Sequence, residues 1–108
     1  MLQVAISRVR PEKEARLRAW LAELNTRVDE VRETFRDETV RAEQAYFVQG
    51  DDGPLLIYVI VAEEFERGAK AYASSHHKID AEHRVVMGEC LAETPKIKPL
   101  YDVALETG

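Results

Sequence analysis

The stretch from Leu55 to Val61 constrains the fold more than any other part of the sequence. It reads Leu-Leu-Ile-Tyr-Val-Ile-Val, so a strand built from it is apolar on both faces. Such a strand lies in the middle of a sheet whose two faces are both covered. The run is far too short to span a membrane. We therefore expect a central strand over residues 55–61.

Alternation of apolar with polar residues predicts the other strands. Period two occurs over residues 2–9 and, in a more polar form, over residues 39–49. Residues 50–54, Gly-Asp-Asp-Gly-Pro, form a turn by composition, so the strands on either side make a hairpin. A last strand is expected near Pro99, which cannot donate to a sheet and so suits an edge or a strand start. Its alternating apolar residues are Tyr101, Val103 and Leu105.

Two helical regions separate these strands. The first follows Pro11, which suits an initial helical turn, and continues to about Arg36 with one apolar face. The second begins near Glu63 and should break at Ser74 and Ser75, because serine is poor in helix interiors and good at N-caps. A further helix then runs to about Leu91. The apolar face of the first region comprises Leu17, Leu21, Leu24, Val28, Val31 and Phe35.

The order strand, helix, strand, strand, helix, strand predicts an α+β fold in one domain, residues 1–108. Right-handed, un-knotted connections favour the ferredoxin-like arrangement βαββαβ, a four-stranded antiparallel sheet with helices on one face and strands one and three at its centre. With helices on one face only, Leu56, Tyr58 and Ile60, or their alternates, would face water. Because exposed apolar patches of that size mark interfaces, we expect a homodimer in which two sheets pack face to face around these three residues.

Charge and cysteine content narrow the range of partners. The formal net charge is −5 and the basic residues are interleaved with acids, which disfavours nucleic acid. The single cysteine, Cys90, cannot form an internal disulfide and is expected to pack as a small hydrophobe. Residues 1–6 lack the pattern of a signal peptide. We therefore expect a cytoplasmic protein with neither nucleic-acid nor membrane partners.

The segment 74–83, Ser-Ser-His-His-Lys-Ile-Asp-Ala-Glu-His, contains all three histidines of the chain. If its helix is continuous from His76, then His76, Asp80 and His83 lie on one stripe. If the helix starts at Asp80, His77 lies on the preceding loop. Either case brings a carboxylate beside an imidazole, and such a partner fixes the imidazole tautomer and raises its basicity, as a general base requires.

The order of elements resembles the dimeric α/β-barrel superfamily, which includes antibiotic-biosynthesis monooxygenases, haem-degrading monooxygenases and small lactone isomerases. Within it, the run from His77 to His83, followed by Glu89-Cys90, is similar to a group of small, uncharacterised bacterial proteins with a Ser-x-His-x-Ile-Asp-x-x-His run and a later Glu-Cys pair. The resemblance implies the fold and a pocket, and it brings no established activity. Further similar positions are Pro11, Trp20, Leu24, Asn25 and Tyr58.

Three interpretations of the histidine segment are open. In the first, His77, Asp80 and His83 are catalytic or binding groups at the mouth of an apolar cavity. In the second, they bind zinc or iron, with Glu43 or Cys90 completing the shell, although the spacing matches no common metal motif and we expect no metal. In the third, Asp80 caps the helix and the histidines bond buried carbonyls or cross a dimer interface.

The first interpretation gives the function that we expect. A small, partly apolar organic molecule would bind between sheet and helices and, in an enzyme, undergo proton transfer, isomerisation or cofactor-free oxygenation. His77 or His83 would be the base and Asp80 its orienting partner, with no cofactor required. A non-catalytic ligand carrier or accessory subunit would use the same pocket, so the sequence leaves open whether the protein is an enzyme. The expected ligand-binding residues are Trp20, Phe47, Tyr58 and His76.

Overall fold

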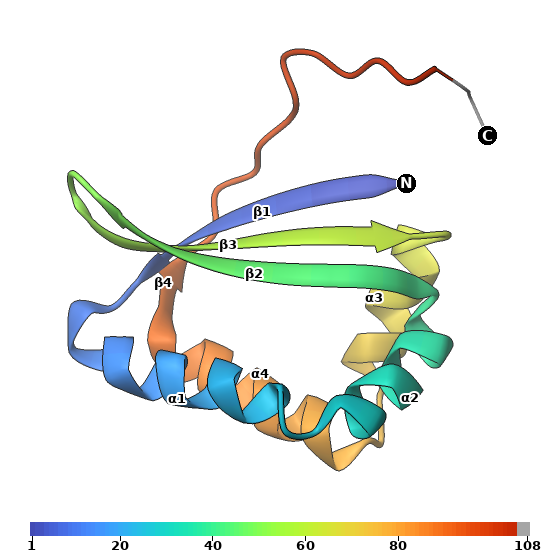
Figure 1. Cartoon of the computed structure of the whole chain (residues 1–108), viewed down its shortest axis with the longest axis horizontal. Coiled ribbons are helices and arrows are strands. Elements are labelled where there is room, and N and C mark those ends of the chain that lie inside the picture. The colour runs from blue at the N-terminus through green and yellow to red at the C-terminus, as the bar shows by residue number, and fades with distance from the viewer. Residues whose placement is uncertain (106–108) are drawn as a thin grey trace.

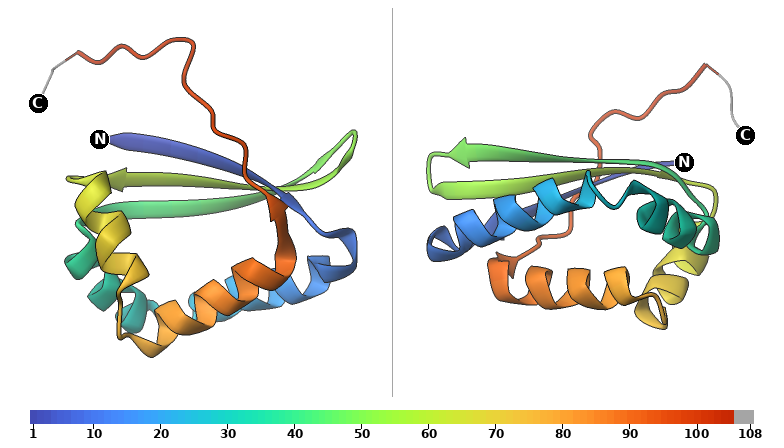
Figure 2. Two further views of the ribbon diagram at one scale, coloured as in Figure 1. Left: turned by 180° about the vertical axis from the view of Figure 1, so that it is seen from behind. Right: turned by 60° about the horizontal axis from the view of Figure 1, so that its bottom comes forward.

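The computed structural model describes residues 1–105 and shows an α+β fold with one four-stranded antiparallel sheet (Figure 1). In chain order the elements are β1 (Leu2–Val9), the 3-10 helix η1 (Pro11–Lys13), α1 (Glu14–Leu24), α2 (Val28–Glu38), β2 (Val40–Gly50), β3 (Gly53–Ala62), α3 (Phe65–Ala73), α4 (Lys78–Cys90) and β4 (Leu91–Glu93). The helices lie on one side of the sheet and leave the other side open (Figures 1 and 2).

The strand order in the sheet is β2-β3-β1-β4, so β1 and β3 are central, as the sequence predicted. The sheet and its helices are compatible with a ferredoxin-like fold. No helix within residues 1–105 has both the length and the apolar character needed to cross a membrane.

The single helix predicted after Pro11 is wrong, because the chain breaks between α1 and α2. The N–H groups of Thr26 and Arg27 bond back to carbonyls three residues earlier, and the Thr26 hydroxyl donates to the Glu23 carbonyl at 2.7 Å. Asn25 and Thr26 compete for main-chain groups with their own side chains, which favours a turn. The break lets α1 pack on α4 while α2 packs on α3.

The predicted break at the two serines is confirmed. Helix α3 ends at Ala73 and α4 begins at Lys78, with His77 in the extended conformation of an N-cap. The hydroxyl of Ser75 accepts a hydrogen bond from the His77 N–H at 3.1 Å. Asp80 therefore lies inside the first turn of α4, so the prediction that Asp80 caps this helix, one part of the third interpretation, is wrong.

The strand predicted near Pro99 is also wrong. The fourth strand is β4, which begins directly after α4 and pairs with the end of β1, opposite Arg8 and Val9. Pro95 and Pro99 follow within a few residues and cannot donate to a sheet. The chain from residue 94 to residue 105 instead runs away from the body on the open side of the sheet (Figure 1). Its exposed apolar side chains are Ile97, Leu100, Tyr101, Val103 and Leu105.

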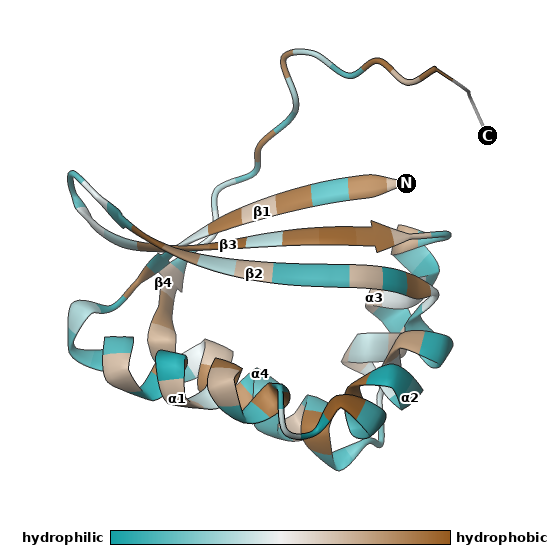
Figure 3. Cartoon of the chain, in the orientation of Figure 1, coloured by the Kyte–Doolittle hydropathy of each residue, from teal (hydrophilic) through white to brown (hydrophobic). Residues whose placement is uncertain are grey.

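The two sides of β3 differ from the expectation. Leu56 is fully buried against the helices, and Tyr58 and Ile60 point to the same side. The interface predicted around these three residues is therefore wrong, and the odd-numbered residues of β3 occupy the open side. We call that side the open apolar face. The ribbons of β1 and β3 are mostly brown, as expected for apolar strands (Figure 3). By register its members are Leu2, Val4, Ile6, Tyr46, Val48, Leu55, Ile57, Val59 and Val61.

The core lies between the sheet, α1 and α4. Cys90 has no exposed surface and packs there, which confirms its predicted role as a small hydrophobe. Further from this core, towards α2 and α3, the helices and the sheet enclose a cavity instead. The core residues are Val9, Leu17, Trp20, Leu56, Ile79, Val86 and Cys90.

Candidate functional site

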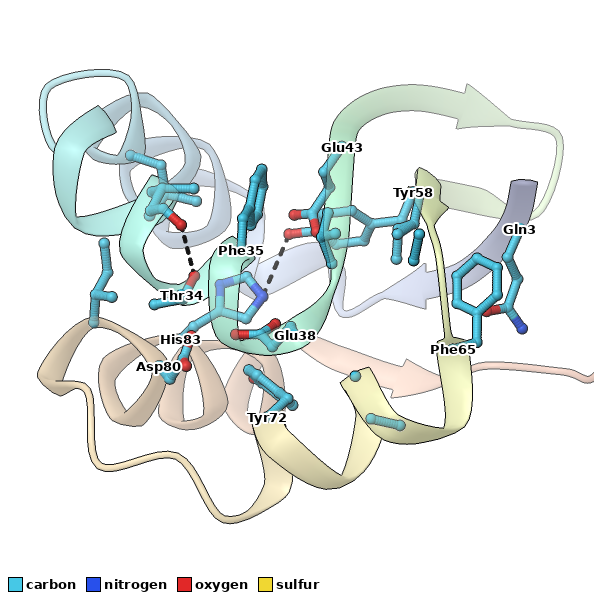
Figure 4. Close-up of a pocket in the computed structure, with 18 of the residues that line it drawn as sticks. Gln3, Thr34, Phe35, Glu38, Glu43, Tyr58, Phe65, Tyr72, Asp80 and His83 are labelled. Carbon is cyan, nitrogen blue, oxygen red and sulfur yellow. Dashed lines mark hydrogen bonds between the residues drawn. The ribbon is translucent and has the colours of Figure 1, made fainter. Parts of the chain in front are cut away.

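A cavity of about 430 Å³ lies between the sheet and helices α2, α3 and α4 (Figure 4). This volume is within the range of sites for small organic molecules. A second hollow, between α2 and β2, shares Phe35, Glu43 and Tyr58 with it, so the cavity opens beside the edge strand β2. The titratable side chains that line the cavity are Glu38, Glu43, Tyr58, Tyr72, Asp80 and His83.

His83 reaches the cavity from α4 with one nitrogen already occupied. The indole N–H of Trp20 donates to Nδ1 of His83 at 2.9 Å, so Nδ1 is an acceptor and the neutral ring carries its proton on Nε2. Nε2 lies 3.4 Å from the Tyr58 hydroxyl, which is longer than an ordinary hydrogen bond. Burial lowers the pKa of His83, against the opposing charge of Asp80. His83 therefore presents a neutral N–H donor to the cavity.

Trp20, rather than Asp80, orients the imidazole. The sequence predicted Trp20 as a ligand-binding residue, but its side chain is buried in the core and does not line the cavity. Its N–H holds the tautomer that leaves no lone pair on Nε2. This arrangement suits hydrogen-bond donation by His83 and does not suit the general-base role expected from the sequence.

Three carboxyl groups meet in the same cavity from three elements. Glu38 is the last residue of α2, Glu43 lies on β2 and Asp80 lies in the first turn of α4. Asp80 is only 6% exposed. Within residues 1–105, Oδ2 of Asp80 and Oε2 of Glu38 are buried without a hydrogen-bond partner. Such oxygens are costly to bury and mark a place where a donor is needed.

Crowding of these acids changes how they titrate. Burial first, and then the negative charge of Asp80, raise the pKa of Glu38 to about 8. The same two causes raise the pKa of Glu43 to about 7. The Glu43 residue is accessible to solvent on the edge strand, but its carboxyl end turns into the cavity, where desolvation acts (Figure 4). Glu38 therefore keeps its proton at neutral pH, because neighbouring carboxylates resist ionising together.

Two tyrosines complete the polar lining. Burial is the main cause that raises the pKa of Tyr72 to about 12, and it also raises the pKa of Tyr58. Both phenols are thus protonated and can donate. Arg84 fixes the end of α3, because its guanidinium donates to the Tyr72 carbonyl at 2.7 Å and lies 5.4 Å from the centre of the Tyr72 ring.

Of the residues that the sequence singled out, three line the cavity together: Tyr58, Asp80 and His83. Among those that do not line the cavity, His77 bonds Asp37 through Nε2 at 2.7 Å, and this bond raises the pKa of His77. His76 is exposed on the loop before α4.

Phe47 also lies outside the cavity lining, because its ring packs against the guanidinium of Arg18, 4.0 Å from the ring centre.

The two histidines proposed as catalytic have separate partners: His77 bonds Asp37, and His83 bonds Trp20. Within residues 1–105 no three His, Cys, Asp or Glu side chains are grouped as a metal site.

Sequence reasoning missed Glu38 and Tyr72, and considered Glu43 only as a metal ligand. A signal for Glu43 was present, since it occupies the helix-facing side of β2 together with the apolar residues Ala45 and Phe47. No comparable pattern in the sequence marks Glu38. The feature that distinguishes its position is the backbone of the next residue: Thr39 ends α2 with a φ of 58°, a left-handed value that is rare for a β-branched residue.

A model of a family of unknown function (DUF6176) matches residues 2–107. The chain belongs to this family. No curated protein and no solved structure matches it. Membership in DUF6176 brings no activity with it, so the function of this DUF6176 protein must be inferred from the cavity.

The acid cluster predicts an unusual dependence of stability on pH. Because folding raises the pKa of Glu38 and Glu43 from 4.5, the folded DUF6176 protein binds more protons than the unfolded chain between about pH 4.5 and 8. Their contribution to the free energy of unfolding should therefore decline as the pH rises through this window. His83 acts in the opposite direction below about pH 6.5, because its pKa is lowered. Urea unfolding at a series of pH values measures the combined effect of these groups on the free energy of unfolding.

Glu38→Gln isolates the contribution of one carboxyl. This variant should flatten the decline above pH 6.5 and unfold at higher urea concentration than the parent protein at pH 8. Glu33→Gln, at an exposed position of the same helix, should change neither property. A parent protein whose stability climbs steadily from pH 6.5 to 8 would show that the carboxyls are not desolvated.

Proposed function

We propose that this protein binds a small, partly apolar organic molecule in the cavity between the sheet and helices α2 to α4. One observation supports this above the others: an apolar cavity of about 430 Å³ has buried, unpartnered carboxyl oxygens of Glu38 and Asp80 in its lining. A cavity with mostly apolar walls and a few convergent polar groups is the usual form of a ligand site. His83 adds a fixed N–H donor to the same lining.

A neutral fluorescent probe, phenylnaphthylamine, tests this proposal. Its fluorescence should rise saturably as it enters the cavity. Ala69→Phe should abolish that saturable response, because Ala69 lines the cavity and the new ring would occupy it. Ala73→Phe is the matched control, since Ala73 lies on the same helix and is exposed like Ala69 but does not line the cavity. Equal responses from both variants would place the probe elsewhere and refute the proposal.

The titration of the acids favours proton transfer as a second candidate function in the same cavity. General acid–base catalysis works best when the pKa of the catalytic group is near the working pH, and Glu38 and Glu43 have pKa values of about 8 and 7. An isomerase would use one of them to move a proton while His83 donates a hydrogen bond. Cofactor-free oxygenation would begin with the same proton removal and would then need O₂. A carrier would bind without turnover.

We also propose that a second copy of the chain covers the open apolar face, as in the dimeric α/β barrels that the sequence resembles. Three adjacent strands contribute apolar side chains to that face, and Leu2 remains 64% exposed. Apolar surface of this extent on one side of a sheet is typical of an interface. The exposed apolar residues of the 94–105 segment lie on the same side (Figure 1). The single, buried Cys90 fits the cytoplasmic setting that we propose.

The dimer proposal predicts a contrast between two valine substitutions. Val59→Asp should give a monomer, because Val59 lies on the central strand of the open apolar face and the new charge would be buried without a partner. Val85→Asp should leave the dimer intact, since Val85 is exposed on α4, on the other side of the molecule. Sedimentation velocity at micromolar concentration distinguishes the species. A parent protein that sediments as a monomer contradicts the proposal.

A further inference from the structure

The cavity has an excess of acceptors and negative charge. Glu38, Glu43 and Asp80 line it from three different elements, and of residues 1–105 none that lines it is a lysine or an arginine. The salt bridges found within residues 1–105 do not include these three acids; they lie elsewhere and involve mostly exposed side chains. The three carboxyl groups therefore have no cationic partner of their own among the residues around the cavity (Figure 4).

Two of the donors in the cavity lining are directed at groups other than these acids. The Thr34 hydroxyl donates to the Val31 carbonyl at 2.7 Å, and Nε2 of His83 faces Tyr58. Asp80 is more than nine-tenths buried and lines the cavity, with Oδ2 lacking a partner within the described residues. A bound molecule that supplies donors at this place would satisfy oxygens that the protein leaves unpaired.

We propose that the cavity is specific for a protonated organic amine, whose ammonium group is held between Glu38, Asp80 and Glu43 and whose apolar body lies in the rest of the cavity. This inference rests on the proposed function, because it names the chemical class of the ligand in that same cavity. A hydrogen bond between an ammonium and a carboxylate is about twice as strong as one between neutral groups. A buried site without its own cation selects strongly for such a ligand.

The aromatic lining supports the same ligand class. The rings of Phe35, Tyr58 and Tyr72 lie beside the acids, and Phe65 lines the cavity further away (Figure 4). Their faces attract a cation, and their area suits the apolar part of an amine. The acid oxygens accept hydrogen bonds, so an amine that still carries N–H groups fits better than a quaternary ammonium, which has none.

Binding of a cation should also displace protons. The titratable groups that line the cavity with Glu38 and Glu43 are Asp80 and His83 from α4, Tyr72 from α3 and Tyr58 from β3. Among them no group is positive at pH 7, because burial lowers the pKa of His83 and raises that of both phenols. Before a cation binds, protons on the glutamates relieve the repulsion. The ammonium replaces them, so protons leave on binding.

Calorimetric titration with phenethylamine and with phenethyl alcohol tests the inference. The two probes share an apolar body and differ in the charged group. At pH 7 the amine should bind at least roughly tenfold more tightly than the alcohol. The heat for the amine should differ between phosphate and MOPS buffers, because released protons are taken up by the buffer, whereas the heat for the alcohol should not. Phenethyltrimethylammonium should bind less tightly than the amine.

Substitutions of the acids test whether these side chains cause the preference for the amine. Glu38→Gln and Asp80→Asn should each lose the preference for the amine and reduce the proton release, while Glu33→Gln, at an exposed position of the same helix, should keep both. Circular dichroism and binding of phenylnaphthylamine check that each variant is folded with its cavity intact. Glu38→Gln removes a desolvated acid and should fold at least as well as the parent.

The outcomes separate this inference from the proposed function. If phenylnaphthylamine binds in the cavity but the alcohol matches the amine, or neither competes with it, the amine inference is overturned and the proposed function stands. If the amine preference survives in both acid variants, the inference is overturned as well. If phenylnaphthylamine fails to bind in the cavity at all, the proposed function itself fails.

Discussion

Gly68→Ala should destabilise the folded protein by roughly 2–4 kcal/mol, although alanine is the better helix former. Gly68 lies in the middle of α3, where that helix crosses the end of α2. A Cβ added at Gly68 would overlap the main-chain carbonyl oxygen of Glu38. Main-chain atoms cannot move aside as a flexible side chain can, so the two helices would have to separate. The shift would also displace the Glu38 carboxyl, and we expect weaker binding of phenylnaphthylamine in the same variant.

Gly88→Ala is the matched control. Gly88 also lies inside a helix, α4, but apart from its chain neighbours and the backbone of α4 itself, no atom of residues 1–105 lies within 4 Å of the Cβ that alanine would add there. Only the helix propensity changes, and this variant should gain about 0.5–1 kcal/mol. Urea unfolding of both variants measures the contrast. If Gly68→Ala were stabilised to the same extent as Gly88→Ala, the close contact between α2 and α3 would be absent.

Local patterns in the sequence were enough to predict most of the elements. The alternation in residues 2–9, the apolar run from Leu55 and the two serines at residues 74 and 75 each act over a few residues, and β1, β3 and the break before α4 follow from them. The positions of β1 and β3 in the centre of the sheet followed from general rules of chain connection. Such features depend on short-range geometry, which a sequence displays directly.

Features that depend on distant contacts were not predictable in this way. An all-apolar strand does not show which of its sides the helices will cover, so the burial of Leu56 on the helix side could not be assigned. The apolar periodicity of the first helical region continues through Asn25 and Thr26 and hid the break there. Tyr101, Val103 and Leu105 alternate like a strand, but the strand beside β1 comes from the residues directly after α4.

The site shows the same division. Asp80 and His83 were found because titratable groups are concentrated in one segment. Glu38, Glu43 and Tyr72 come from three other elements and meet these two only in the folded chain. The effect of Trp20 on the tautomer of His83 depends on a contact across 63 positions of the sequence, and no local pattern indicates it.

His83→Ala should cost roughly 2–4 kcal/mol of stability, because it leaves the indole N–H of Trp20 buried without an acceptor and removes a largely buried ring. Trp20 is 8% exposed, so water cannot easily replace the lost partner. His77→Ala should cost less than about 1 kcal/mol, since its bond to Asp37 lies at the surface. Thermal and urea unfolding compare the two variants. Equal losses in both would contradict the separate roles that the structure gives these histidines.

A double-mutant cycle shows whether the loss in His83→Ala comes from the indole. Trp20→Phe removes the N–H donor while keeping an aromatic ring in the core. In that background His83→Ala should cost about 1–2 kcal/mol less than in the parent protein, because no donor is left unpaired. Trp20→Phe also frees Nδ1 of His83, so the pKa of His83, followed by NMR, should rise towards its ordinary value. If that pKa and the cost of His83→Ala are both unchanged, Trp20 does not hold the tautomer, and a general-base role for His83 becomes available again.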